Sequence, residues 1–219
     1  MVAEPESLAT EEPLEAHIRR HHFDRLIMLT DGVFAIAVTL AAIELHIPIG
    51  KGTLGEVLHA VHLPLSIYLV SFLVSAVFWI GNRDLFARLK RADPVLTALN
   101  LAMLSMVALI PAAMHFADAQ GDVTGSLRFY ALVMVLCGGF NAAMWAYASR
   151  REGMMKPEVP KPYRLARTVS ALMVPVLFLP MLVVDTTMLF TWLVPAVLVV
   201  AILRRIVIPQ FEKRGGGKG

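Results

Sequence analysis

The stretch that decides the fold is Arg25–Pro48, RLIMLTDGVFAIAVTLAAIELHIP. Its 23 residues from Leu26 onward would form about 34 Å of α-helix, enough to cross a membrane. The stretch nevertheless carries Arg25 and Asp31 near one end. A carboxylate in a spanning helix is costly in lipid, so it usually pairs with another group, or faces protein or water. The sequence therefore predicts a transmembrane helix that does more than anchor the chain.

Bulky aliphatic side chains follow one line along this helix: Ile36, Leu40, Ile43 and Ile47. At about 100° per residue they fall within roughly 60° of one another, and Asp31 falls about 140° away. Thr39 lies about 60° from Ile36 and would add a hydroxyl beside the line. The line is compatible with ordinary packing or lipid contact. If several copies surround an axis, it would instead form stacked hydrophobic rings, which exclude water and restrict ion size.

The composition is that of an integral membrane protein. The chain has 219 residues, of which 57% are hydrophobic and 17% charged, with a mean hydropathy of +0.66. Soluble domains are about 45–50% apolar and about 25% charged. The single cysteine, Cys137, excludes a disulfide within the chain and a cysteine-based metal site.

Six apolar segments are each near the ~20 residues that a spanning helix needs. They are residues 25–48, 57–80, 94–116, 127–149, 165–184 and 186–206. Because the runs are continuous rather than alternating, we expect an all-α, polytopic membrane protein with six transmembrane helices.

The basic residues predict the orientation. If the N-terminus is cytoplasmic, 18 of the 20 Lys and Arg lie on the cytoplasmic side, and only Lys51 and Arg128 lie outside. This asymmetry predicts that both termini are cytoplasmic. Residues 1–15 hold five glutamates and no Lys or Arg, the reverse of a signal peptide. We therefore expect a disordered tail, acidic and then basic, over 1–22, a membrane domain over 23–208, and a basic, glycine-rich tail over 209–219.

Little of the chain is left outside the bilayer. The 150–164 loop, rich in proline and basic residues, reads as an extended linker. There is no room for a soluble catalytic domain, and the sequence contains no TVGYG loop, Walker A motif, HExxH or GxSxG. We therefore expect neither an enzyme nor a protein that needs a cofactor. Two pairs of small residues in the fourth segment, Gly138/Ala142 and Gly139/Ala143, favour close helix packing.

Polar residues recur at the depth of Arg25 and Asp31. Trp79 and Asn82 end the second segment, and Asn100 falls at a similar depth in the third. These five side chains can form a polar layer that ties the helices together. The alternative is that they are wet residues at the membrane interface.

The pattern Arg25-x-x-x-Leu29-Thr30-Asp31, followed by GVFAIAVTL, resembles the RxxxFSD signature of the transmembrane protein 175 family. Leu29 stands in place of the usual Phe and Thr30 in place of the usual Ser. The family comprises the endosomal and lysosomal potassium channel and shorter bacterial relatives. Trp79 and the following RDLFARLKRADP are also similar to the family, in which Trp-x-x-His is common, although Asn82 stands at the His position here.

This resemblance implies a homotetramer of six-helix subunits in which the first helix of each subunit lines a central pore. It implies passive conduction of potassium over sodium through constrictions at Ile36, Leu40 and Ile43, with Thr39 as the nearby hydroxyl. The implied polar network that holds this helix comprises Arg25, Thr30, Asp31, Trp79, Asn82 and Asn100. The expected partners are further copies of the chain, membrane lipid and permeant potassium ions, without nucleic acid, in a prokaryotic plasma membrane.

Two other functions are compatible with the residues. A proton-coupled secondary transporter would use Asp31 or Glu44. A membrane enzyme or a scaffold without a pore is the third possibility. Coupled, saturable flux would identify the transporter, and a monomer would favour the transporter or the scaffold.

Overall fold

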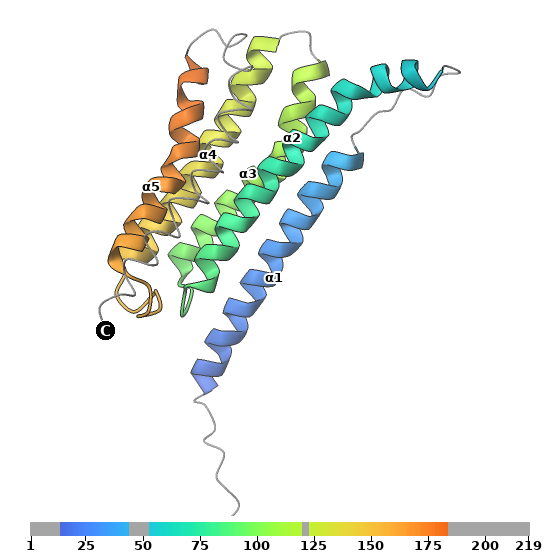
Figure 1. Cartoon of the computed structure of the whole chain (residues 1–219). Coiled ribbons are helices and arrows are strands. Elements are labelled where there is room, and N and C mark those ends of the chain that lie inside the picture. Colours follow the sequence, from blue (N-terminus) through green and yellow to red (C-terminus); the bar gives the residue numbers. More distant parts are fainter. Residues whose placement is uncertain (1–13, 44–52, 120–122, 184–219) are drawn as a thin grey trace, which may run out of the picture.

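The computed structural model describes residues 14–43, 53–119 and 123–183, and all of its long elements are α-helices (Figure 1). They are α1 (Leu14–Ile43), α2 (Leu54–Ala87), α3 (Pro94–Ala119), α4 (Val123–Arg150) and α5 (Lys161–Phe178), followed by the 3-10 helix η1 (Leu179–Leu182). The only β-type pairing in the described part of the chain is an isolated antiparallel bridge between Leu89 and Met155. The all-α prediction is confirmed for these residues.

Four described segments are long and apolar enough to cross a membrane: Tyr68–Ala87, Pro94–Ala113, Gly125–Arg150 and Lys161–Leu182. Helix α1 is described only to Ile43, so the remainder of the predicted first span lies outside the described residues. The predicted sixth span, 186–206, and the tail 209–219 also lie outside them. Which side of the membrane holds the termini stays a prediction.

Two helix boundaries differ from the sequence prediction. Residues 14–22, assigned above to a disordered tail, are helical, because extending an existing helix adds one hydrogen bond for each residue fixed. Figure 1 shows this end of α1 projecting beyond the other helices. Helix α2 continues to Ala87 rather than ending near residue 80, because its last turns bury Leu85 and Phe86.

Helix α4 packs extensively on both α3 and α5, and α1 packs on α3 and α2. Figure 1 shows α1 at the opposite side of the described bundle from α5. Helix α4 lies close to α5 at Gly138, where an added Cβ would lie 2.6 Å from Cδ of Pro175. Gly139 has no such neighbour within 4 Å. The small-residue pattern therefore marks a close contact at Gly138 and not at Gly139.

The segment between α4 and α5 is not the extended linker predicted from its prolines. It forms turns that bury Met154, Met155 and Val159 against the ends of the helices. Gly153 adopts a positive φ of 69°, a conformation that favours glycine. The composition suggested an exposed loop, but its methionines supply apolar surface that the helix ends can cover.

Candidate functional site

Helix α1 has two different faces. Leu26, Thr30, Phe34 and Ala37, spaced three or four residues apart, are buried against the neighbouring helices. The predicted aliphatic line lies elsewhere on the surface, and the exposed fractions of Ile36, Leu40 and Ile43 are 60%, 39% and 75%. The part of the chain that the structure describes therefore covers these three side chains only partly. Ile47 and Glu44 lie outside the described residues.

Thr39 is exposed near the same line. Its hydroxyl lies 3.0 Å from the carbonyl oxygen of Ala35 and 2.9 Å from that of Ile36, to which it donates. The hydroxyl proton is therefore used within the helix, and the side-chain conformation is fixed by it.

A chain of buried hydrogen bonds joins α2, α3 and α1. Nδ2 of Asn82 donates to Oδ1 of Asn100 at 2.9 Å, and Nδ2 of Asn100 donates to the hydroxyl of Thr30 at 2.8 Å. Thr30 in turn donates to the carbonyl oxygen of Leu26 at 2.8 Å. Because all three side chains are buried, each bond satisfies groups that would otherwise lack water.

A second contact joins α1 to α2. Nε1 of Trp79 donates to Oδ1 of Asp31 at 2.8 Å. The guanidinium of Arg83 lies 5.3 Å from the centre of the Trp79 ring, within the range of a cation–π interaction. Arg25 is exposed and lies about 140° around α1 from Thr30, away from the buried chain of hydrogen bonds.

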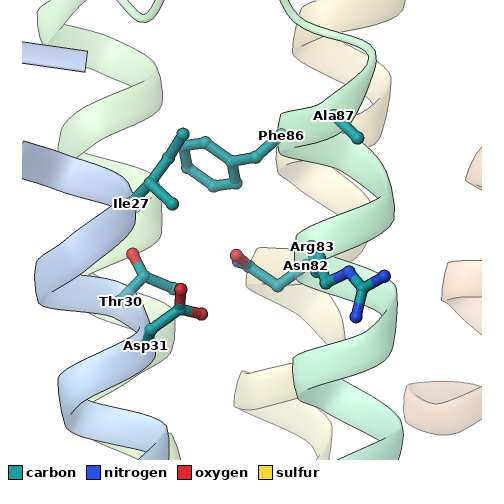
Figure 2. A pocket seen from close by; sticks show the side chains of 7 residues that line it. All are labelled: Ile27, Thr30, Asp31, Asn82, Arg83, Phe86 and Ala87. Atoms are coloured by element: carbon teal, nitrogen blue, oxygen red, sulfur yellow. The ribbon is translucent and has the colours of Figure 1, made fainter. Parts of the chain in front are cut away.

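A cavity of about 220 Å³ lies between α1 and α2 beside these contacts (Figure 2). Figure 2 shows Ile27, Thr30 and Asp31 on one wall and Asn82 directed at them from the other. The guanidinium of Arg83 points away from α1 in this view. Asp31 therefore meets Trp79, and not Arg83, across the gap between the helices.

The structure thus brings five of the six predicted network residues into two contacts between helices. Thr30, Asn82 and Asn100 form one, and Asp31 and Trp79 form the other. Arg25 belongs to neither. Within the described residues, no group of three or more His, Cys, Asp or Glu side chains is placed to hold a metal ion.

The sequence analysis missed a second polar cluster, which joins the end of α2 to α5. Asp84 pairs with Arg88, the residue that caps the end of α2, and with Arg167 on α5, and it accepts a hydrogen bond from the hydroxyl of Tyr163. The four-residue spacing of Asp84 and Arg88 was a visible signal for a helical ion pair. No sequence signal predicted the contact of Asp84 with α5, because the residues that make it are far apart in sequence.

Asp93 lies just before α3 and accepts a hydrogen bond from the backbone N–H of Leu96 and another from Tyr147. Burial raises the pKa of Asp93, but these two bonds and the charge of Arg151 outweigh it and hold the pKa below its ordinary value.

Comparison with known proteins places the chain in a family. The family model described as endosomal/lysosomal potassium channel TMEM175 matches residues 25–111. A potassium channel of Streptomyces collinus is 33% identical over 146 residues, which are 63% of this chain and 70% of the relative. The chain belongs to the TMEM175 family. The resemblance inferred from the signature is confirmed, and the family and its relatives are ion channels rather than enzymes.

More distant TMEM175 relatives differ in their described activity. A potassium channel of Chamaesiphon minutus is 27% identical over 140 residues, 60% of this chain and 68% of the relative. A zebrafish protein described as an endosomal/lysosomal proton channel is 28% identical over 126 residues, 56% of this chain but only 24% of the relative.

The fold also matches a solved structure of the TMEM175 family. The crystal structure of a lysosomal potassium-selective channel TMEM175 homolog from Chamaesiphon minutus superposes with a TM-score of 0.64 and 22% identity. The match covers 90% of this chain and 100% of that one. At this identity the likeness shows the fold: this is a multi-pass membrane protein of TMEM175 architecture, helical throughout the spans that the structure describes.

Proposed function

We propose that this chain is a subunit of a potassium-selective cation channel that conducts passively. Its membership of the TMEM175 family and the potassium channels among its relatives support this function. The observation that carries it is the exposed aliphatic line of α1, which lies away from the face that the helix buries. A large apolar line without cover in one chain is suited to a surface that further copies complete.

In the proposed assembly, four copies bring this face of α1 to a common axis. Ile36, Leu40 and Ile43 are three or four residues apart, so they would form rings about 4.5–6 Å apart along the pore. Hydrophobic rings of this kind gate by excluding water, and they let an ion pass only when it sheds part of its hydration. Thr39 would lie beside these rings.

The contacts of α1 with α2 and α3 would hold the pore helix in place. The bonds of Thr30 and Asp31 fix both the rotation and the height of α1. Arg25 and Ile43 are 18 residues apart, about five full turns, so Arg25 lies at the other end of the exposed face. We assign Arg25 to the cytoplasmic mouth, in a prokaryotic plasma membrane with both termini inside.

A second candidate function is proton movement, which the name of the zebrafish relative favours. In that case Asp31, which is exposed within one chain, or Glu44 would carry the proton. If the protein is instead a secondary transporter, it would move a substrate across the membrane only together with protons.

The test is flux into liposomes that contain the purified protein. We expect potassium to move down its gradient without a pH gradient, and Ile36→Ser to increase the flux and weaken the preference for potassium over sodium. Val176→Ser on α5 is the matched control, because Val176 is 66% exposed, close to the 60% of Ile36. It should leave flux and selectivity unchanged.

Flux that requires a pH gradient and saturates would favour the transporter instead. Equal effects of the Ile36 and Val176 substitutions, or no effect of either, would remove the pore assignment of α1.

A further inference from the structure

The end of α2 near Ala87 is held on two sides. On one side Trp79 donates a hydrogen bond to Asp31 on α1, and Asn82 donates one to Asn100 on α3, which in turn binds Thr30 on α1. On the other side Asp84, only two residues beyond Asn82, is bound by α5. Burial of Leu85 and Phe86 and the stacking of Phe86 on Phe23 of α1 also hold this end.

The contact with α5 is made by a cluster of charged and aromatic side chains, here called the inner cluster: Asp84, Arg88, Trp145, Tyr163 and Arg167. Nη2 of Arg167 lies 2.5 Å from Oδ2 of Asp84, and Nε of Arg167 donates to the hydroxyl of Tyr163 at 2.9 Å. The Arg88 guanidinium lies 4.6 Å from the centre of the Tyr163 ring, and that of Arg167 lies 5.8 Å from the centre of Trp145. The cluster therefore spans α2, α4 and α5.

Backbone contacts reinforce the cluster. The N–H of Lys90 donates to the carbonyl oxygen of Met154, and the N–H of Lys156 donates to that of Arg88, each at 2.9 Å. Nζ of Lys156 also donates to the carbonyl oxygen of Ala87 at 2.8 Å. The loop between α4 and α5 thus binds the backbone just where α2 ends.

From this arrangement we propose that Asp84 and Arg167 are positioning residues for the pore helix. They fix the end of α2 against α5, and through α2 they set where Trp79 binds Asp31 on α1 and where Asn82 binds Asn100, the partner of Thr30 on α1. The inference rests on the proposed channel function, in which the place of α1 decides conduction.

The physical link is short. Asp84 and Trp79 are five residues apart, about 7.5 Å along one helix. A helix moves as a rigid element over this distance, so a shift at Asp84 becomes a shift at Trp79. Removing Arg167 would leave the partly buried Asp84 with less compensation for its charge, which favours such a shift.

The test substitutes Arg167→Gln in the full chain, reconstituted as for the flux measurement. We expect an unchanged oligomeric mass and a potassium flux altered by roughly two- to tenfold. Amide hydrogen exchange should rise at residues 84–90 and also at 26–34 of α1, which the inner cluster does not touch. Asp93→Asn is the matched control: Asp93 also accepts a bond from α4 but lies outside α2, so exchange at 26–34 and flux should stay unchanged.

A double-mutant cycle separates this link from general weakening. Because Arg167 and Trp79 would act through the same displacement, the effects of Arg167→Gln and Trp79→Phe on flux should be less than additive. If Arg167→Gln prevents folding, Arg167→Lys keeps a cation without the planar fork and should give a smaller effect of the same kind.

Additive effects on flux, or increased exchange confined to 84–90 and the α5 side, would overturn the proposal. Wild-type protein without potassium flux would refute the proposed channel function instead. The exchange at 26–34 would in that case still decide whether the inner cluster positions α1.

Discussion

Asn100 is a single residue on which two helix contacts depend. It donates to Thr30 on α1 and accepts from Asn82 on α2, and it is fully buried. Replacing it by leucine of similar size would leave the buried amide N–H of Asn82 without this acceptor, at a cost of about 1–3 kcal/mol, and would remove the bond that the Thr30 hydroxyl accepts.

We therefore expect Asn100→Leu to lower the stability of the detergent-solubilised protein by about 2 kcal/mol or more, measured by thermal or denaturant unfolding. Leu101→Ala, at the exposed neighbouring position, should change it little. Equal losses in both variants would mean that the buried bonds contribute no special stability.

Asp93 should make stability depend on pH in the acid range. Its pKa in the folded protein is below the ordinary value of 3.8, so its contribution is fully present above that value and is lost as the pH falls further. Asp93→Asn should therefore flatten the loss of stability below about pH 4. Unfolding midpoints measured from pH 6 to pH 3 check this, and parallel curves for both proteins would contradict it.

At the scale of residues, the sequence could indicate which side chains share a depth but not which of them touch. Asp31, Trp79, Asn82 and Asn100 were grouped by their position along three helices, and the structure joins them in pairs. That Asn100 binds Thr30 depends on the rotation of α1, which no residue spacing specifies. Their role in holding a pore remains a prediction.

At the scale of helices, Gly138 is a position where the close packing of α4 on α5 leaves no room for a side chain. A methyl group there would meet Pro175 and Val174, and overpacking of this kind costs about 1–3 kcal/mol. We expect Gly138→Ala to lower the unfolding midpoint in detergent.

The adjacent Gly139→Ala provides the control. It meets open space and should be neutral or slightly stabilising, because alanine favours helix by up to about 1 kcal/mol. A lower unfolding midpoint for Gly139→Ala than for Gly138→Ala would contradict the α4–α5 contact at Gly138.

Hydropathy predicted the existence of the described helices better than their ends. Helix α2 continues seven residues beyond the predicted residue 80 because Leu85 and Phe86 are covered by other parts of the fold. The prediction of an extended linker after α4 was wrong for the same reason, because burial of Met154 and Met155 depends on partners distant in sequence.

At the scale of the whole molecule, the predicted orientation can be tested with single introduced cysteines. The only native one, Cys137, is buried, so its background reaction should be low. Glu152→Cys and Arg128→Cys place thiols at exposed positions at opposite ends of α4.

A membrane-impermeant maleimide added outside intact cells should label Arg128→Cys and spare Glu152→Cys, and inside-out vesicles should give the reverse. The same pattern in both preparations would mean mixed orientation or a miscounted span. The sequence supports this prediction through the asymmetry of its charges, but it contains no comparable signal for the number of copies that assemble.

The hydroxyl of Thr39 would have a further consequence in the proposed channel. Because its proton is bonded to a carbonyl of the same helix, the outward side of the oxygen offers only lone pairs. A ring of such oxygens would give a weakly negative electrostatic potential although it carries no formal charge. In the proposed pore it would favour a partly dehydrated cation over an anion of the same size, so charge discrimination there would require no acidic residue.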